Sequence, residues 1–111
     1  MENIYDAELT TKAGRNGHVK SSDGLLDLDI RFPKEMGGSG GATNPEQLFA
    51  AAWSACFGTS IITSAGIEKI KIGEVSVTTK ISVLHSNSNF DLAANLIVKI
   101  DDIDTITAKK N

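Results

Sequence analysis

Two residue types in this chain could together perform thiol chemistry: a single cysteine and an arginine. Cys56 is the only cysteine among 111 residues and lies in the stretch TNPEQLFAAAWSACF, residues 43–57. An ordinary thiol has a pKa of about 8.5, so it becomes a strong nucleophile only beside a positive charge or a helix N-terminus. Cys56 lies about three turns beyond the predicted helix start, where the helix dipole is weak. Any activating charge must therefore come from another segment.

Arg15 is our candidate for that charge, because it lies in a glycine-flanked turn at residues 13–17. The residue types alone leave plainer interpretations open. A free cysteine often serves as a small buried hydrophobe, and an arginine in a turn is usually solvated.

The helix that carries the thiol has clear start signals. Asn44 can act as the N-cap, Pro45 suits the first helical position, and Gln47 can complete a capping-box-like arrangement. The pattern predicts a helix to about Ala65, with Gly66 as the C′ residue. The helix is apolar almost all round and must be covered almost all round. A second copy of the chain is the simplest source of that cover.

Alternating segments predict antiparallel strands before and after this helix. Residues 4–11 and 26–32 precede it, and residues 75–83 and 90–100 follow it as a long hairpin that turns at residues 86–89. Asp104 could cap a further helical turn. We therefore expect one α+β domain, residues 1–111, in which antiparallel strands wrap a long central buried helix.

The glycine-rich segment at residues 37–41 is interpreted as a flexible connector. A phosphate loop is disfavoured, because no Gly-Lys-Ser/Thr follows and no Gly-x-Gly-x-x-Gly pattern fits a strand-to-helix turn.

Composition excludes several classes of function. The chain is 41% hydrophobic and 23% charged, with a net charge of −3 and a pI of about 5.2. These values give no basic patch for nucleic acid, and no uninterrupted apolar run approaches the roughly 18 residues that span a membrane. The N-terminus lacks a signal-peptide pattern, and one cysteine cannot form an internal disulfide, so we expect a cytoplasmic protein. His18, His85 and Cys56 have no metal-ligand spacing, so no metal is expected.

Two sequence blocks carry a family resemblance. Residues 14–24, GRNGHVKSSDG, and the TNPEQLFAAAWSACF block resemble the signature blocks of organic hydroperoxide resistance proteins, the Ohr branch of the Ohr/OsmC family. The resemblance covers essentially the whole chain in order. It implies a cytoplasmic thiol-dependent peroxidase that reduces organic hydroperoxides without a cofactor, built as an intertwined α+β homodimer.

The resemblance also assigns roles to three residues. The peroxidatic cysteine matches Cys56, the activating arginine matches Arg15, and the carboxylate that orients this arginine matches Glu46. Taken alone, Glu46 would more often be a carboxylate that favours the helix dipole.

Geometry adds a hypothesis about subunits. Glu46 and Cys56 are ten residues apart, which on one helix is about 15 Å along the axis and about 80° around it. One arginine can hardly reach both, so we expect a site that combines Cys56 with Glu46 of the other subunit, unless Arg15 approaches at a slant or the helix bends.

Apolar neighbours of the thiol point to the substrate class. Phe49, Trp53 and Phe57 lie within a turn or two of Cys56, and a pocket formed by them would favour alkyl or fatty-acid hydroperoxides over hydrogen peroxide. Aromatic residues at helical spacing also suit a plain core. Trp53 follows Ala52, where the family more often has tyrosine after glycine, so the pocket's shape could differ.

The C-terminal part departs from the family pattern. The family's second cysteine, in a block resembling Val-Cys-Pro-Tyr-Ser on a second long helix, and its closing strands have no match in this chain. Without a resolving thiol the sulfenic acid at Cys56 cannot close an intramolecular disulfide, so it would be reduced by an external thiol or a dihydrolipoyl-type reductant, or be overoxidised after one event. The missing elements indicate a partly exposed core, further oligomerisation or a chain cut from a longer parent.

Two other functional classes remain open. A catalytically impaired remnant or redox-responsive interaction protein could retain the front half of the family. A hot-dog-type thioesterase or acyl-binding module would use Glu46 as its active carboxylate and Cys56 only for packing. Replacing Cys56 by serine separates that last class from a peroxidase.

Overall fold

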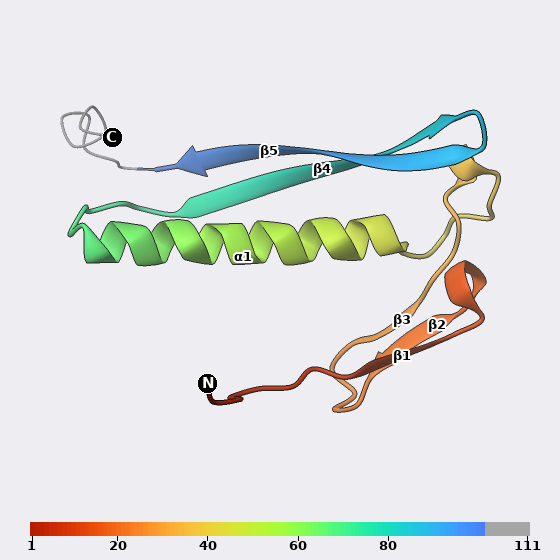
Figure 1. Cartoon of the computed structure of the whole chain (residues 1–111), viewed down its shortest axis with the longest axis horizontal. Coiled ribbons are helices and arrows are strands. Elements are labelled where there is room, and N and C mark those ends of the chain that lie inside the picture. Colours follow the sequence, from red (N-terminus) through yellow and green to blue (C-terminus); the bar gives the residue numbers. More distant parts are fainter. Residues whose placement is uncertain (102–111) are drawn as a thin grey trace. The chain divides into compact units, whose positions relative to one another are not determined.

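The computed structural model describes residues 1–101, which form a mixed α+β structure with one α-helix and antiparallel strands (Figure 1). The chain divides into two compact units, Met1–Leu48 and Phe49–Asn111. The α+β class expected from the sequence is confirmed, whereas the single domain stays a prediction.

The N-terminal unit contains a three-stranded antiparallel sheet in the order β1-β2-β3. Its strands are β1 (Leu9–Lys12), β2 (His18–Ser21) and β3 (Asp27–Asp29). Val19 of β2 and Ile30, which follows β3, are only 5% and 3% exposed. They are the buried hydrophobic residues of the described chain, so the unit's own core is small.

Both predicted strands of this unit are shorter than expected. The first begins at Leu9 rather than Ile4, and Ile4 itself is 86% exposed. The second ends at Asp29, after which Ile30 forms a single parallel bridge with Thr43. Alternation alone sets no strand ends, because these depend on where a partner strand stops.

The glycine-rich segment has a defined backbone, contrary to the flexible connector expected. It follows the 3₁₀ turn η2 (Lys34–Met36), which Gly37 closes in a left-handed conformation with φ of 83°. The N–H of Gly38 donates to the Pro33 carbonyl and that of Gly40 to the Phe32 carbonyl, each at 3.0 Å. The segment therefore folds back onto the chain that precedes it.

Helix α1 (Pro45–Ile67) begins where the sequence predicts. The Gln47 N–H donates to Asn44 Oδ1 at 2.9 Å, which confirms the N-cap. In a capping box the Gln47 side chain would also accept from the Asn44 backbone N–H. Here Gln47 Oε1 accepts a hydrogen bond from the Thr43 hydroxyl at 2.7 Å.

The other end of α1 lies beyond the predicted stop. Gly66 is still helical, and Lys69 takes the left-handed conformation with φ of 56°. The Ile70 N–H donates to the Ala65 carbonyl and the Lys69 N–H to the Gly66 carbonyl. This is the Schellman pattern with a lysine at C′. Glycine preference misplaced the C′ residue by three positions, since Lys69 rather than Gly66 occupies it.

The C-terminal unit pairs most of α1 with a long β-hairpin. The hairpin consists of β4 (Val75–Ser86) and β5 (Asn89–Ile100), in register from Val75 opposite Ile100 to Ser86 opposite Asn89. Asn87 and Ser88 form its turn with positive φ. The predicted hairpin and its turn are thus confirmed, while the helical turn suggested at Asp104 lies outside the described residues.

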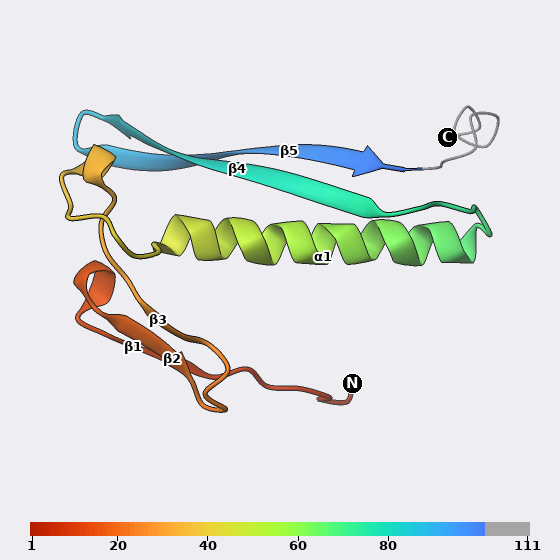
Figure 2. The same cartoon turned by 180° about the vertical axis from the view of Figure 1, so that it is seen from behind.

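The hairpin lies along one side of α1 (Figures 1 and 2). The Ser54 and Thr79 hydroxyls are hydrogen-bonded at 2.7 Å. A side chain added at Gly58 would lie 3.6 Å from a Val77 methyl group. Ser54 and Gly58 of the helix therefore face the hairpin.

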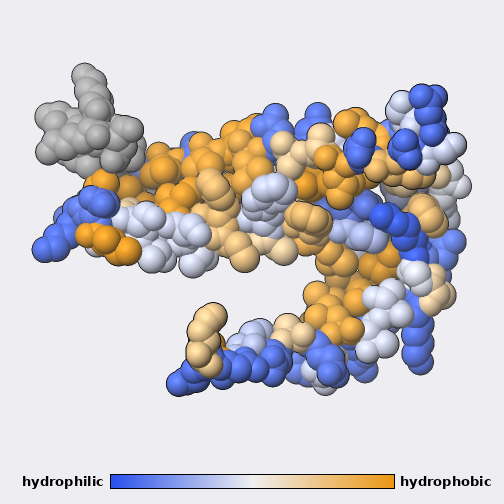
Figure 3. Space-filling model, in the orientation of Figure 1, coloured by the Kyte–Doolittle hydropathy of each residue, from blue (hydrophilic) through white to orange (hydrophobic). Residues whose placement is uncertain are grey.

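The hairpin covers only one side of α1 (Figures 1 and 2). None of its residues is buried in the described structure, and apolar side chains extend over the helix and hairpin (Figure 3). By length and composition alone, α1 could cross a membrane, with a mean hydropathy of 1.4. Counting uninterrupted apolar residues in the sequence did not identify α1 as a possible membrane span, because Ser, Thr and Gly interrupt its apolar residues. The core helix of a soluble protein passes the same test.

Candidate functional site

A tight turn between β1 and β2 presents Arg15. The turn is the 3₁₀ segment η1 (Gly14–Asn16), entered through two left-handed residues, Ala13 with φ of 60° and Gly14 with φ of 54°. The Asn16 N–H closes it on the Ala13 carbonyl at 3.1 Å. Glycine suits such a backbone, since it carries no Cβ penalty.

Arg15 forms a two-pronged ion pair with Glu46 at the start of α1. Its Nη1 and Nη2 atoms donate to Glu46 Oε1 and Oε2 at 2.8 and 2.7 Å. The arginine side chain is 36% exposed and the glutamate side chain 15%. Two parallel bonds fix the orientation of the guanidinium as well as its position.

The pair changes the acid–base properties of both side chains. The hydrogen bonds from Arg15 hold the pKa of the Glu46 carboxyl below its usual value. The same hydrogen bonds raise the pKa of Arg15. Glu46 is therefore a carboxylate at neutral pH, and the guanidinium beside it is firmly charged.

Two adjacent residues that the sequence did not single out also support Arg15. The guanidinium carbon of Arg15 lies 5.7 Å from the centre of the Phe32 ring, a cation–π distance. Arg31 Nη1 donates to the Gly17 carbonyl at 2.8 Å, two residues after Arg15. In the sequence Phe32 looked like the last apolar residue of a strand, and nothing signalled a contact with the turn.

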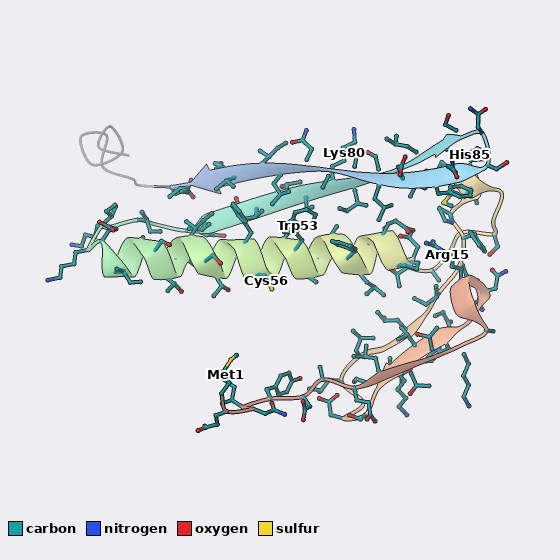
Figure 4. The ribbon with its side chains drawn as sticks, viewed as in Figure 1. Met1, Arg15, Trp53, Cys56, Lys80 and His85 are labelled. Carbon is teal, nitrogen blue, oxygen red and sulfur yellow. The ribbon has the colours of Figure 1, made fainter. Side chains whose placement is uncertain are left out.

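Cys56 lies in the C-terminal unit, in the middle of α1, and is exposed. Its side chain points away from the hairpin (Figure 4). Ser54 and Gly58, two residues to either side, lie on the hairpin face. The thiol is thus accessible in the described chain.

The three aromatic residues expected to form a pocket are all partly exposed. Phe49 is 49% exposed, Trp53 37% and Phe57 40%, and the rings of Phe49 and Trp53 are 5.6 Å apart. Phe57 lines a hollow of about 400 Å³, together with residues of the helix end and hairpin that include Ile61, Ile70, Ile72 and Ile100. The pocket of three aromatics stays a prediction.

The predicted site residues fall into two groups. Arg15 and Glu46 are in contact within the N-terminal unit. Cys56 is ten residues beyond Glu46 on one uninterrupted helix, a separation of about 15 Å along its axis. Because the helix is continuous, the separation on which the two-subunit hypothesis rests is present. A site that combines Cys56 with Glu46 of the other subunit stays a prediction.

A second charged cluster lies on the N-terminal sheet. His18 Nδ1 is 2.7 Å from Asp29 Oδ1, and His18 Nε2 also contacts Asp27. These carboxylates, Asp29 foremost, raise the pKa of His18. Among residues 1–101, no group of three or more His, Cys, Asp or Glu side chains is arranged to hold a metal ion.

Fold and site together define an α+β protein with an exposed thiol on a long helix and a preformed arginine–glutamate pair. Residues 38–110 match the family of OsmC-like proteins. The chain therefore belongs to the OsmC-like family.

Named relatives agree with this assignment. An organic hydroperoxide resistance protein of Xanthomonas axonopodis pv. citri is 38% identical over 103 residues, which are 91% of this chain and 72% of that protein. The protein OhrB of Bacillus subtilis is 37% identical over 110 residues, covering 96% and 79% of the two chains.

A solved structure is similar as well. The crystal structure of an organic hydroperoxide resistance protein OsmC from Legionella pneumophila has a TM-score of 0.88 and 41% identity, and the match covers 98% of this chain and 80% of that one. Relatives of this kind thus extend beyond the part that the present chain matches.

Proposed function

We propose that this protein is a thiol-dependent peroxidase that reduces organic hydroperoxides to alcohols through Cys56. The observation that carries the proposal is the two-pronged Arg15–Glu46 pair in a chain similar to organic hydroperoxide resistance proteins. The exposure of Cys56 supports it, because a peroxide must reach the sulfur. The single cysteine fits the reducing conditions of a cytoplasm.

The reaction transfers one oxygen atom to sulfur. The Cys56 thiolate attacks the terminal oxygen of ROOH, an S–O bond forms and the O–O bond breaks. The alkoxide that leaves takes up a proton and becomes ROH, while sulfenic acid remains on Cys56. Sulfur loses two electrons and the peroxide gains them, so the step balances without a cofactor.

Arg15 would assist this step by electrostatics. Its guanidinium favours the thiolate over the thiol and stabilises the charge that develops on the departing oxygen. Glu46 holds the guanidinium in one orientation through both of its carboxylate oxygens. An arginine held in advance has less reorganisation to undergo during the reaction.

We propose further that the site is shared between two chains. Glu46 and Cys56 are too far apart along α1 for one arginine to bridge easily. A homodimer would bring the Arg15–Glu46 pair of one chain to Cys56 of the other. It would also cover the exposed aromatic face of α1.

Mixing two inactive variants tests the shared site. Cys56→Ala and Arg15→Ala protomers, combined by reversible denaturation, should regain about a quarter of the parent activity if each site takes residues from both chains. Sites confined to one chain would leave the mixture inactive.

The neighbours of Cys56 favour apolar substrates. Phe49, Trp53 and Phe57 present apolar surface on the same helix, so alkyl or fatty-acid hydroperoxides should react faster than hydrogen peroxide. The sulfenic acid cannot form a disulfide within this chain, which has one cysteine. We therefore propose an external thiol or a dihydrolipoyl-type compound as reductant.

Intact-mass spectrometry tests the first half-reaction. The reduced protein receives one equivalent of cumene hydroperoxide, with hydrogen peroxide in a parallel sample. We expect rapid addition of one oxygen atom, lost in Cys56→Ala and in Arg15→Ala and slower with hydrogen peroxide.

An unchanged mass in the folded protein would contradict peroxidase activity. It would favour the alternative of an impaired family member or redox-responsive interaction protein. The single cysteine of this chain is the observation behind that alternative.

A further inference from the structure

The glycine-rich segment has no role in the proposed chemistry, yet it is folded tightly against Phe32. The Gly40 N–H donates to the Phe32 carbonyl at 3.0 Å, and the Gly38 N–H donates to the carbonyl of Pro33. Both N–H groups are therefore used inside the loop. A phosphate loop needs such groups free to face an anion, and these two N–H groups are not free.

Gly38 leaves no room for a side chain. A Cβ atom at this position would lie 2.2 Å from both the Cβ and the carbonyl oxygen of Phe32. Gly38 is not among the glycines with positive φ, so the requirement for glycine comes from this close approach. Any larger residue must push the loop and Phe32 apart.

Phe32 in turn contacts the guanidinium of Arg15. The guanidinium carbon lies over the Phe32 ring, 5.7 Å from its centre, while the two Nη atoms bind the carboxylate of Glu46. Glu46 restrains the guanidinium through its N–H groups, and the ring restrains it through its flat face. The Phe32 ring opposes rotation of the Arg15 guanidinium that the Glu46 carboxylate alone would permit.

Phe32 is not part of a buried core. The buried hydrophobic residues of the described chain are Val19 and Ile30, and Phe32 is only half-buried. Its ring is a partly exposed surface for the cation.

The residue before Phe32 joins both segments that carry the ion pair. The Arg31 side chain donates to the Gly17 carbonyl at 2.8 Å, just after the Arg15 turn. The Arg31 backbone N–H donates to the Thr43 carbonyl at 2.9 Å, just before α1. The backbone that carries Phe32 is thereby anchored to the turn and to the helix start.

We propose that Phe32 is a positioning residue for Arg15 and that the glycine-rich segment, through Gly38, seats Phe32 against it. The consequence for catalysis rests on the function proposed for Arg15. The positioning itself does not depend on that function and can be measured separately.

The direct test follows the Arg15 guanidinium by NMR. We expect Phe32→Leu to speed rotation of the guanidinium by about two- to fivefold, because the cation–π contact is lost. Phe32→Tyr keeps the ring face and should behave like the parent. Unchanged rotation in a folded Phe32→Leu protein would overturn the proposal.

A matched pair of glycine variants tests the loop. Gly38→Ala should loosen Arg15 as Phe32→Leu does. Gly66→Ala is the control, since a Cβ at Gly66 meets nothing within 4 Å. Equal guanidinium dynamics in the two folded alanine variants would contradict the role of Gly38. If Gly38→Ala fails to fold, the Phe32 variants still decide the main proposal.

A second readout separates this inference from the proposed function. The rate of Cys56 alkylation by iodoacetamide is measured across pH for the same variants. If the pH midpoint of the alkylation rate is higher in Phe32→Leu and unchanged in Phe32→Tyr, both the positioning by Phe32 and the action of Arg15 on Cys56 are supported. Faster guanidinium rotation with an unchanged profile supports the positioning by Phe32 and contradicts the action of Arg15 on Cys56.

Discussion

Arg15 and Glu46 are 31 residues apart in the sequence, and their side chains meet through hydrogen bonds of 2.8 and 2.7 Å. The contact links the turn after β1 to the first turn of α1. It therefore fixes two chain segments as well as two charges, and both effects can be tested.

Arg15→Lys should slow the oxidation of Cys56 by cumene hydroperoxide by about tenfold or more. Lysine keeps the positive charge but cannot form two parallel bonds with a carboxylate. Stopped-flow fluorescence can follow the reaction, because Trp53 is the only tryptophan and lies three residues before Cys56. Lys80→Arg in the hairpin is the control. An unchanged rate in Arg15→Lys would mean that the charge alone suffices.

Glu46 should make part of the folding stability depend on acid pH. Its pKa in the folded protein is lowered by Arg15 from about 4.5, so the unfolded state binds its proton first as the pH falls. The stabilisation is complete above the usual glutamate range and is lost as the pH falls through the lowered pKa.

Urea unfolding between pH 7 and pH 3 checks this expectation. Glu46→Gln should have a lower free energy of unfolding than the parent at pH 7. This free energy should also fall less steeply toward acid pH in Glu46→Gln than in the parent. Glu35→Gln, in the exposed turn η2, serves as the control. If the free energy of unfolding had the same pH dependence in the parent and in Glu46→Gln, the predicted contribution of Glu46 would be contradicted.

His18 should have the opposite pH dependence. Asp29 and, to a lesser degree, Asp27 raise its pKa above the usual 6.5. The stabilisation is therefore fully present below pH 6.5 and is lost as the pH rises through the raised pKa.

An NMR titration of the His18 ring measures that pKa. Asp29→Asn should lower the midpoint more than Asp27→Asn, because Asp29 is the larger cause of the shift. The His85→Asn variant identifies the His18 signal, since the chain has two histidines. A midpoint that neither aspartate variant changes would show that the cluster does not form in solution.

Lys69→Gly should stabilise the protein by about 0.5–1 kcal/mol. Lys69 occupies the left-handed C′ position after α1, with φ of 56°, and glycine adopts this conformation without a Cβ penalty. Thermal unfolding of the parent and of Lys69→Gly gives the comparison. Lys71→Gly, outside the left-handed position, should bring no such gain.

Local patterns predicted the fold well where the signal lies within one segment. The Asn44 N-cap and the Val75–Ile100 hairpin follow from residue type and alternation, and the structure has both. The helix end was misplaced, because a lysine rather than Gly66 adopts the left-handed conformation. Which residue takes the left-handed conformation depends on the hydrogen bond from the Ile70 N–H to the Ala65 carbonyl, and composition does not predict that bond.

The candidate site was predictable only in part. Cys56, Arg15 and Glu46 came from the two family-like blocks, and the contact between Arg15 and Glu46 is present. The contact of Phe32 with Arg15 could not be foreseen, because it joins the end of one extended segment to a turn 17 residues earlier. The role of Gly38 depends on that contact and was missed with it.

The exposed aromatic face of α1 has a consequence for how this protein behaves on dilution. Its own buried hydrophobic residues, in the described part, are Val19 and Ile30, so in the proposed homodimer much of the stabilising burial would come from association. Folding and association would then be one equilibrium, and the unfolding midpoint would rise with protein concentration. A cell that makes little of the protein would hold a larger share of it unfolded than one that makes much.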